Sequence, residues 1–129
     1  MGIPTIGKAL ISDRMLGITA MACADYLELG TGNTAFAITD TALGAAITGD
    51  GLARAQDATP TSATTTVTDD SGVLNYTWTA TGAQTVKEAG SFNHVTSGSG
   101  SMLHREVLGT ARALTTGSTY TYTVTFVVA

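Results

Sequence analysis

Residues 118–128 read STYTYTVTFVV, and they alternate between threonine and larger apolar residues over almost their whole length. The even positions from 120 to 128 hold Tyr, Tyr, Val, Phe and Val, whereas the odd positions from 119 to 125 all hold Thr. Successive side chains of a β-strand point to opposite faces, so this period of two predicts a half-buried strand. The stretch is the clearest structural signal in the chain, and it favours an all-β fold.

Two upstream stretches predict further strands. VLNYTWTAT (residues 73–81) places Leu74, Tyr76, Trp78 and Ala80 on one face. The DDSG turn signal precedes it, and ATTTVT (residues 63–68) is the expected hairpin partner. On these alternating faces, the tryptophan and the tyrosines are expected in the core rather than in a sugar-binding platform.

The stretch TVKEAGSFNHVTSGSGSMLHREVL is richer in catalytic residue types than any other part of the chain. Its SGSG segment predicts a hairpin tip between two strands. A register symmetric about that tip places Val86 opposite Val107 and Glu88 opposite Arg105. Opposite charges across two strands form a common stabilising pair, worth under about 1 kcal/mol when exposed. The polar residues of this stretch therefore have structural explanations.

The overall composition agrees with an all-β fold. The chain has 129 residues, enough for one domain, and only 12% of them are charged. Its 25 threonines keep a strand surface polar without charge, and its 15 glycines suit many turns. We expect an antiparallel β-sandwich or a jelly-roll-like barrel, with a short strand at Asp25–Leu29. One short helix is expected after Thr39, with Leu43 and Ile47 on one face.

Residues 1–22 differ from the remainder, because they are apolar, interrupted by glycine and without a clean period. We expect them to form an extended N-terminal arm with one helical turn near residues 12–16, attached to a β-sandwich domain of residues 23–129. So many apolar groups must be covered by the domain itself or by a partner. The residues expected to contact a partner are Ile3, Pro4, Ile6, Leu10, Ile11, Met15, Leu16 and Ile18.

No catalytic or metal-binding constellation stands out. A hydrolase needs a nucleophile, a base and an orienting group at one site, and His94 and His104 lack such partners in sequence. Cys23 lies in an Ala/Met run with no basic neighbour, which predicts a small core residue. One cysteine and two distant histidines do not suit zinc, and Asp69 and Asp70 lack the spacing of a calcium-binding loop. The chain is expected to have no enzymatic activity, no cofactor and no metal.

The charge pattern bears on partners and compartment. The net charge is −4 and the six basic residues are scattered, so no basic patch for nucleic acid is expected. No apolar run is long enough for a membrane span, and no signal peptide is recognisable. A single cysteine excludes a disulfide framework and fits a reducing compartment.

The order of several short motifs resembles a family of small virion proteins of tailed bacteriophages. YLELGTGNTAFAITDTAL comes first, a threonine-rich strand pair follows, then TVKEAGSFN, a glycine-serine tip, SMLHREVL and finally LTTGSTYTYTVTFVV. The resemblance covers residues 26–128. Members typically carry a GTG…TDTAL segment, an I-x-E-x-G-x-F strand and a closing L-x-x-G strand; Ser91 stands where the family often has an apolar residue.

This resemblance implies an all-β sandwich that decorates or cements the outside of an icosahedral capsid. The partners would be the major capsid protein and further copies of the chain, as a homodimer or homotrimer. The protein would be located on the virion exterior after assembly in the bacterial cytoplasm. Two alternatives stay open: a tail or baseplate component, and a receptor- or carbohydrate-binding module that uses Trp78 and the loop at residues 93–101.

Overall fold

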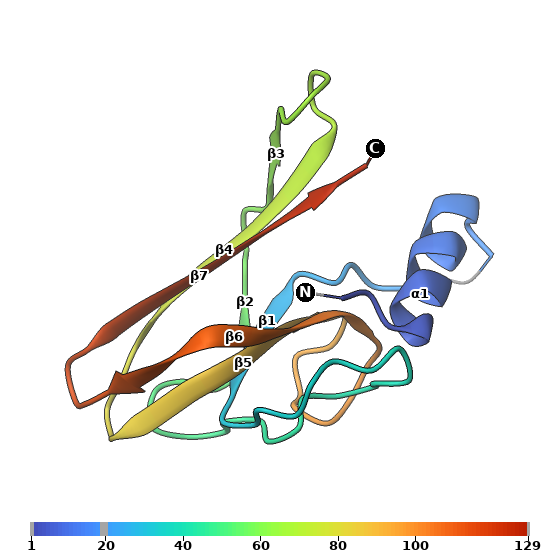
Figure 1. Cartoon of the computed structure of the whole chain (residues 1–129). Helices are drawn as coiled ribbons and strands as arrows, with labels where there is room; N and C mark the ends of the chain where they lie inside the picture. Colours follow the sequence, from blue (N-terminus) through green and yellow to red (C-terminus); the bar gives the residue numbers. More distant parts are fainter. Residues whose placement is uncertain (1, 19–20, 129) are drawn as a thin grey trace.

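The computed structural model describes residues 2–18 and 21–128, so residues 1, 19 and 20 of the expected arm and residue 129 lie outside the described residues. The described chain contains one helix and seven strands (Figure 1). In chain order the elements are α1 (Thr5–Leu16), β1 (Tyr26–Gly30), β2 (Ala55–Gln56), β3 (Thr61–Ala63), β4 (Ser71–Thr79), β5 (Gln84–Phe92), β6 (Met102–Leu114) and β7 (Thr119–Val127).

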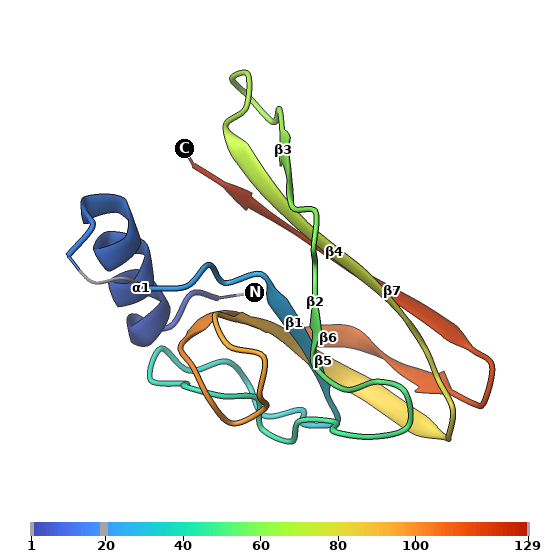
Figure 2. The same ribbon diagram turned by 180° about the vertical axis from the view of Figure 1, so that it is seen from behind.

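The strands form two antiparallel sheets. Sheet A has the order β2-β1-β5-β6, and sheet B has the order β3-β4-β7. The all-β prediction is therefore confirmed, in its sandwich form: within the described residues both sheets stay open and no barrel closes. Sheet B crosses sheet A and extends beyond it, so that β3 and the adjoining ends of β4 and β7 project away from the lower sheet (Figures 1 and 2).

The alternating strands build the core between the sheets. Even-numbered residues of β4 and β7, among them Leu74, Trp78, Tyr122 and Val124, pack onto apolar residues of sheet A. Trp78 is 3% exposed and its Nε1–H donates to the carbonyl oxygen of Ala53 at 2.8 Å. A buried indole with a satisfied N–H is a core residue, as the alternation predicted, and it offers no surface for a sugar.

The predicted hairpin at residues 85–108 exists as β5 and β6, but its register differs from the symmetric one. Glu88 lies opposite Val107, Val86 lies opposite Arg112, and Arg105 lies opposite Gly90. Register shifts occur between residues 86 and 88 and between residues 91 and 92, and the connecting loop spans residues 93–101 instead of a four-residue tip. Such irregularities displace the pairing that a symmetric count gives.

The segment after Thr39 forms turns rather than the predicted helix. Leu43 and Ile47 are buried as expected, yet the backbone between them follows β1. Thr31 N–H donates to the Ala45 carbonyl, and Ile47 N–H donates to the Leu29 carbonyl, both at 2.8 Å. These bonds to a neighbouring strand satisfy the backbone groups that a helix would have paired internally.

The strand predicted at residues 63–68 is wrong, because the partner of β4 is β3, which ends at Ala63, and residues 64–70 form a loop. The Asp70 carboxylate accepts hydrogen bonds from the backbone N–H groups of Thr65, Thr66 and Val67 at 2.8–2.9 Å. These bonds hold the pKa of Asp70 well below its usual value. A side chain that accepts hydrogen bonds from three backbone N–H groups stabilises a turn, because these groups are then not available for pairing with a neighbouring strand.

Candidate functional site

The N-terminal segment is not an extended arm but a helix of three turns docked on sheet A. Gly2 exchanges both backbone hydrogen bonds with Arg105 of β6, at 2.9 and 3.0 Å. A Cβ on Gly7 would collide with the carbonyl oxygen of Leu103, so only glycine lets α1 lie this close to β6. The helix ends at Gly17, whose φ of 64° suits a glycine cap.

The eight predicted contact residues divide into two groups. Four belong to the side of the segment that faces the domain: Ile3 and Ile6 are partly buried, and Pro4 and Leu10 are buried. Ile6 packs against a small cluster formed by Leu43, Phe92 and Met102. The other four are exposed, with exposed fractions of 36% for Ile11, 77% for Met15, 71% for Leu16 and 66% for Ile18. Only this second group remains open to a partner.

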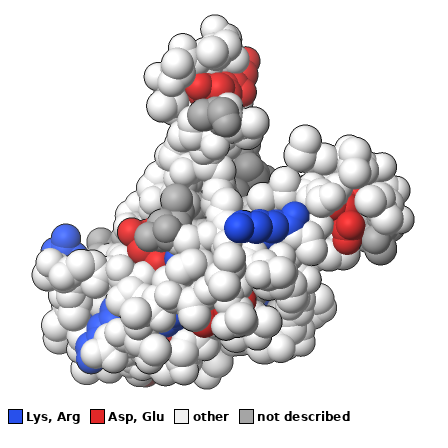
Figure 3. Space-filling model, turned by 45° about the vertical axis from the view of Figure 1, so that its right-hand side comes forward, with Lys and Arg blue, Asp and Glu red and all other residues white. Residues whose placement is uncertain are grey.

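An apolar groove lies between α1 and sheet B, and we refer to it as the α1 groove. One wall comes from Leu10, Ile11 and Met15 of the helix, and the opposite wall comes from strands β4 and β7. Its volume is about 390 Å³, and the notch between the sheet and the helix is visible in the space-filling view (Figure 3). The strand side and the floor are formed by Gly72, Val73, Leu74, Leu103 and Phe126, and the mouth by Arg14, Ala22, Cys23, Ala24, Asp25, Pro60 and Thr61.

Cys23 is exposed at the mouth of the α1 groove, so its predicted core position is wrong. The segment from residue 21 to residue 25 returns from the helix to β1 along the surface rather than through the core. Arg14 ties this return to the helix: its Nη1–H donates to the Met21 carbonyl at 3.0 Å, and its Nη2–H donates to the Cys23 sulfur at 3.4 Å. The thiol therefore lies beside a guanidinium at the mouth of the α1 groove.

The predicted contact between Glu88 and Arg105 exists, although it is buried rather than exposed. An Arg105 Nη2 atom lies 2.8 Å from Glu88 Oε2, and its Nη1 lies 2.8 Å from Asp40 Oδ2. Burial raises the pKa of Glu88, but the N–H donors of Ala45 and Gly44 and the guanidinium of Arg105 outweigh it, so the net pKa is lowered. These charges fasten the turns after β1 to sheet A.

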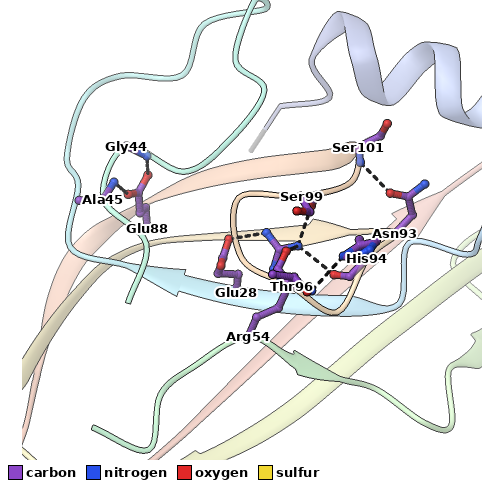
Figure 4. Close-up of polar contacts among 10 residues, drawn as sticks. All are labelled: Glu28, Gly44, Ala45, Arg54, Glu88, Asn93, His94, Thr96, Ser99 and Ser101. Carbon is purple, nitrogen blue, oxygen red and sulfur yellow. Dashed lines mark hydrogen bonds and ion pairs between the residues drawn. The ribbon is translucent and has the colours of Figure 1, made fainter. Parts of the chain in front are cut away.

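A second buried ion pair holds the loop of residues 93–101 (Figure 4). Arg54 Nη2 lies 2.8 Å from Glu28 Oε2, and both side chains are 2% exposed. Arg54 Nη1–H also donates to the carbonyls of His94, Thr96 and Ser99, at 2.8 to 3.0 Å. The Arg54 guanidinium thus binds the loop at three carbonyl groups and holds it against sheet A.

The remaining histidine of the hairpin lies between the two sheets. His104 Nδ1 lies 2.8 Å from the Ser91 hydroxyl, and His104 Nε2 lies 3.1 Å from the Tyr122 hydroxyl, which donates to Glu106 at 2.7 Å. Burial lowers the pKa of His104 to about 4, and burial together with the Glu106 hydrogen bond raises that of Tyr122. Ser91 and His104 resemble a nucleophile and its base, but both are 0% exposed and no substrate reaches them in this conformation.

Residues 2–18 and 21–128 contain no group of three or more His, Cys, Asp or Glu side chains placed to hold a metal ion. Over the same residues, no helix has the length and apolar character needed to cross a membrane. No known protein family and no curated protein matches the chain in sequence.

The sequence predicts one wall of the α1 groove but not the other. The sequence predicts the apolar helix residues as contacts, whereas it places Leu74 and Phe126 of the strand wall on the apolar faces of two strands and Val73 on the opposite face. No sequence signal predicts the strand wall, because it depends on how sheet B crosses and extends beyond sheet A (Figure 1).

Proposed function

We propose that this chain is a capsid decoration protein of a tailed bacteriophage, which binds the outside of the head and links major capsid subunits. The order of motifs across residues 26–128 supports this proposal through its resemblance to small phage virion proteins. The observation that carries it is the α1 groove with its exposed helix residues Ile11, Met15, Leu16 and Ile18. Large apolar side chains clustered beside an apolar groove mark a protein-binding surface.

The chemistry of the groove indicates what would bind there. Its lining is largely apolar, with Arg14 and Asp25 as its charged residues, so it suits an apolar segment of a capsid subunit in extended or helical form. Burying one side chain of the size of Met15 or Leu16 contributes about 1.5–3 kcal/mol. Two or three such contacts contribute about 3–9 kcal/mol per copy, and avidity adds to this where linked copies bind neighbouring capsid subunits.

A cosedimentation assay with heads that lack decoration protein tests the proposal. The double substitution Met15→Asp with Leu16→Asp is expected to weaken head binding at least about tenfold, because 1.4 kcal/mol already corresponds to that factor. Both side chains are more than two-thirds exposed, so the fold is expected to persist. Val67→Asp is the matched control: Val67 is 66% exposed in the loop after β3, away from the groove, and this variant is expected to bind like the unchanged chain.

Point substitutions are preferable to removal of the N-terminal segment. Gly2, Pro4 and Leu10 contact the domain, so a truncation through residue 18 would also expose part of its core. Wild-type protein that fails to bind heads would refute the decoration function. Undiminished binding of the double variant would refute the role of the groove. Recovery of few copies per virion, on tails rather than in proportion to the major capsid protein, would favour the tail or baseplate alternative.

A further inference from the structure

The free edges of the two sheets are not equally protected. Sheet A ends in β2, which has two residues, and in β6, which Gly2 covers at Arg105 and which carries Arg112 in its second half. Sheet B ends in β3, which has three residues, and in β7, which has nine. Proteins normally prevent edge pairing with short strands, charges, prolines or covering segments. β7 uses none of these devices.

The hydrogen-bond pattern fixes which groups of β7 are free. Ala80 N–H donates to the Ser118 carbonyl and Val128 N–H donates to the Asp70 carbonyl, so the even-numbered residues of β7 bond to β4. The odd-numbered residues from Thr119 to Val127 consequently direct their backbone N–H and C=O groups away from β4. Within the described part of the chain, no other strand pairs with β7, and all five odd-numbered residues are exposed.

The sequence of this edge is partly symmetric about Thr123. Reading outward from that residue in both directions gives Tyr122 and Val124, then two threonines, then Tyr120 and Phe126. An antiparallel pair of two β7 strands centred on Thr123 sets Thr121 opposite Thr125, Tyr120 opposite Phe126 and the apolar Val124 opposite Tyr122. The odd-numbered residues, which carry the free backbone groups, face one another in this register. The strand bears no charge, so two copies meet here without repulsion despite the net charge of −4.

We propose that the edge of β7 is a homodimer interface, in which two copies pair antiparallel about a two-fold axis at Thr123 to form one six-stranded sheet. A second copy is the occupant because the edge is complementary to itself in hydrogen bonding, side-chain size and charge. Cross-strand threonine pairs and aromatic pairs both stabilise such a junction. The proposal involves a surface other than the α1 groove and does not depend on the decoration function.

Light scattering after size exclusion tests the interface, over a concentration series reaching about 0.1 mM, which detects a micromolar dimer. The wild-type chain is expected at twice its mass of 13.1 kDa. Thr123→Pro removes one outward N–H without touching the ladder to β4, and it is expected to give 13.1 kDa. Thr123→Lys and Thr123→Glu each place like charges at the two-fold axis and are also expected to be monomeric, whereas their equimolar mixture is expected to restore the dimer.

Thr77→Lys is the matched control, because Thr77 is exposed on the same face of sheet B but lies on the central strand β4. This variant is expected to remain dimeric. A monomeric wild-type chain at all concentrations would overturn the proposal. A dimer that survives both Thr123→Lys and Thr123→Glu, or one that Thr77→Lys dissociates, would overturn it as well, since another surface would then hold the copies together. Circular dichroism confirms folding of each variant, and the charge-swap mixture decides the matter if the proline variant does not fold.

Discussion

Acidification is expected to destabilise the folded chain through one buried side chain, His104. Tyr122 donates its hydroxyl hydrogen to Glu106, so its oxygen accepts from His104 Nε2–H, and His104 Nδ1 is then free to accept from the Ser91 hydroxyl. The imidazole is therefore neutral and fully hydrogen-bonded in the folded state. A proton added to Nδ1 would prevent this atom from accepting the hydrogen bond of the Ser91 hydroxyl. It would also place a charge between the two sheets, where water does not solvate it.

The magnitude follows from the lowered pKa. Burial lowers the pKa of His104 from 6.5 to about 4. Because the unfolded chain binds the proton more readily, the contribution of His104 is fully present above pH 6.5 and is lost as the pH falls toward 4. At 1.36 kcal/mol per pKa unit the full effect is about 3 kcal/mol, of which about 2 kcal/mol is lost between pH 7 and about pH 4.5.

Urea denaturation at several pH values and a fixed protein concentration measures this loss. His104→Gln keeps an acceptor and a donor but has no proton to gain, so its free energy of unfolding is expected to vary much less over the same range. His94→Gln is the control, because His94 is exposed in the loop that Arg54 holds, and its stability profile is expected to follow the wild type. The reasoning is refuted if the His104→Gln profile is as steep as that of the wild type.

Three further predictions concern packing, charge and access. Gly7→Ala is expected to reduce the free energy of unfolding by about 1–3 kcal/mol through its collision with β6, whereas Gly49→Ala, which meets nothing within 4 Å, is expected to leave it almost unchanged; equal urea midpoints would contradict the close approach of the helix. Glu88→Gln leaves the buried guanidinium of Arg105 partly uncompensated, and a loss of about 3 kcal/mol is expected by the same assay; a change below about 1 kcal/mol would show that the pair contributes little. Cys23 is expected to react fully with a maleimide in the native protein, as followed by mass spectrometry, and protection until denaturant is added would contradict its exposed position.

The strands were predictable wherever a single face is buried. The alternation in β4 and β7 follows from local sequence, because each second side chain enters the same core, whereas the hairpin of β5 and β6 was predicted from its glycine-serine segment. The helix after Thr39 was wrong for a related reason: the apolar positions 43 and 47 are buried, but the backbone between them bonds to β1 and to the Glu88 carboxylate. Sequence spacing alone does not distinguish a helix from a turn that a distant carboxylate holds.

The candidate site was less predictable because it depends on how two distant segments meet. The apolar character of residues 1–22 was evident from the sequence, and the exposed residues of α1 belong to this segment. That Gly7 lets α1 approach β6, and that Arg105 pairs with Gly2 through its backbone, depends on tertiary contacts with no sequence signature. The same is true of the register shifts in the hairpin, which moved Glu88 opposite Val107 and left its contact with Arg105 intact.

The buried ion pairs also determine how this protein would encounter a partner. Of six basic and ten acidic residues, two basic and three acidic side chains are enclosed: Arg54, Arg105, Glu28, Asp57 and Glu88. Four basic and seven acidic side chains remain for the rest of the molecule, and the face shown in Figure 3 carries few charges of either sign. Long-range attraction then contributes little to the association rate, which is expected to lie near the unsteered value of about 10⁵–10⁶ M⁻¹s⁻¹ and to change little with ionic strength. A complex formed by such a surface would persist in media of very different salt content.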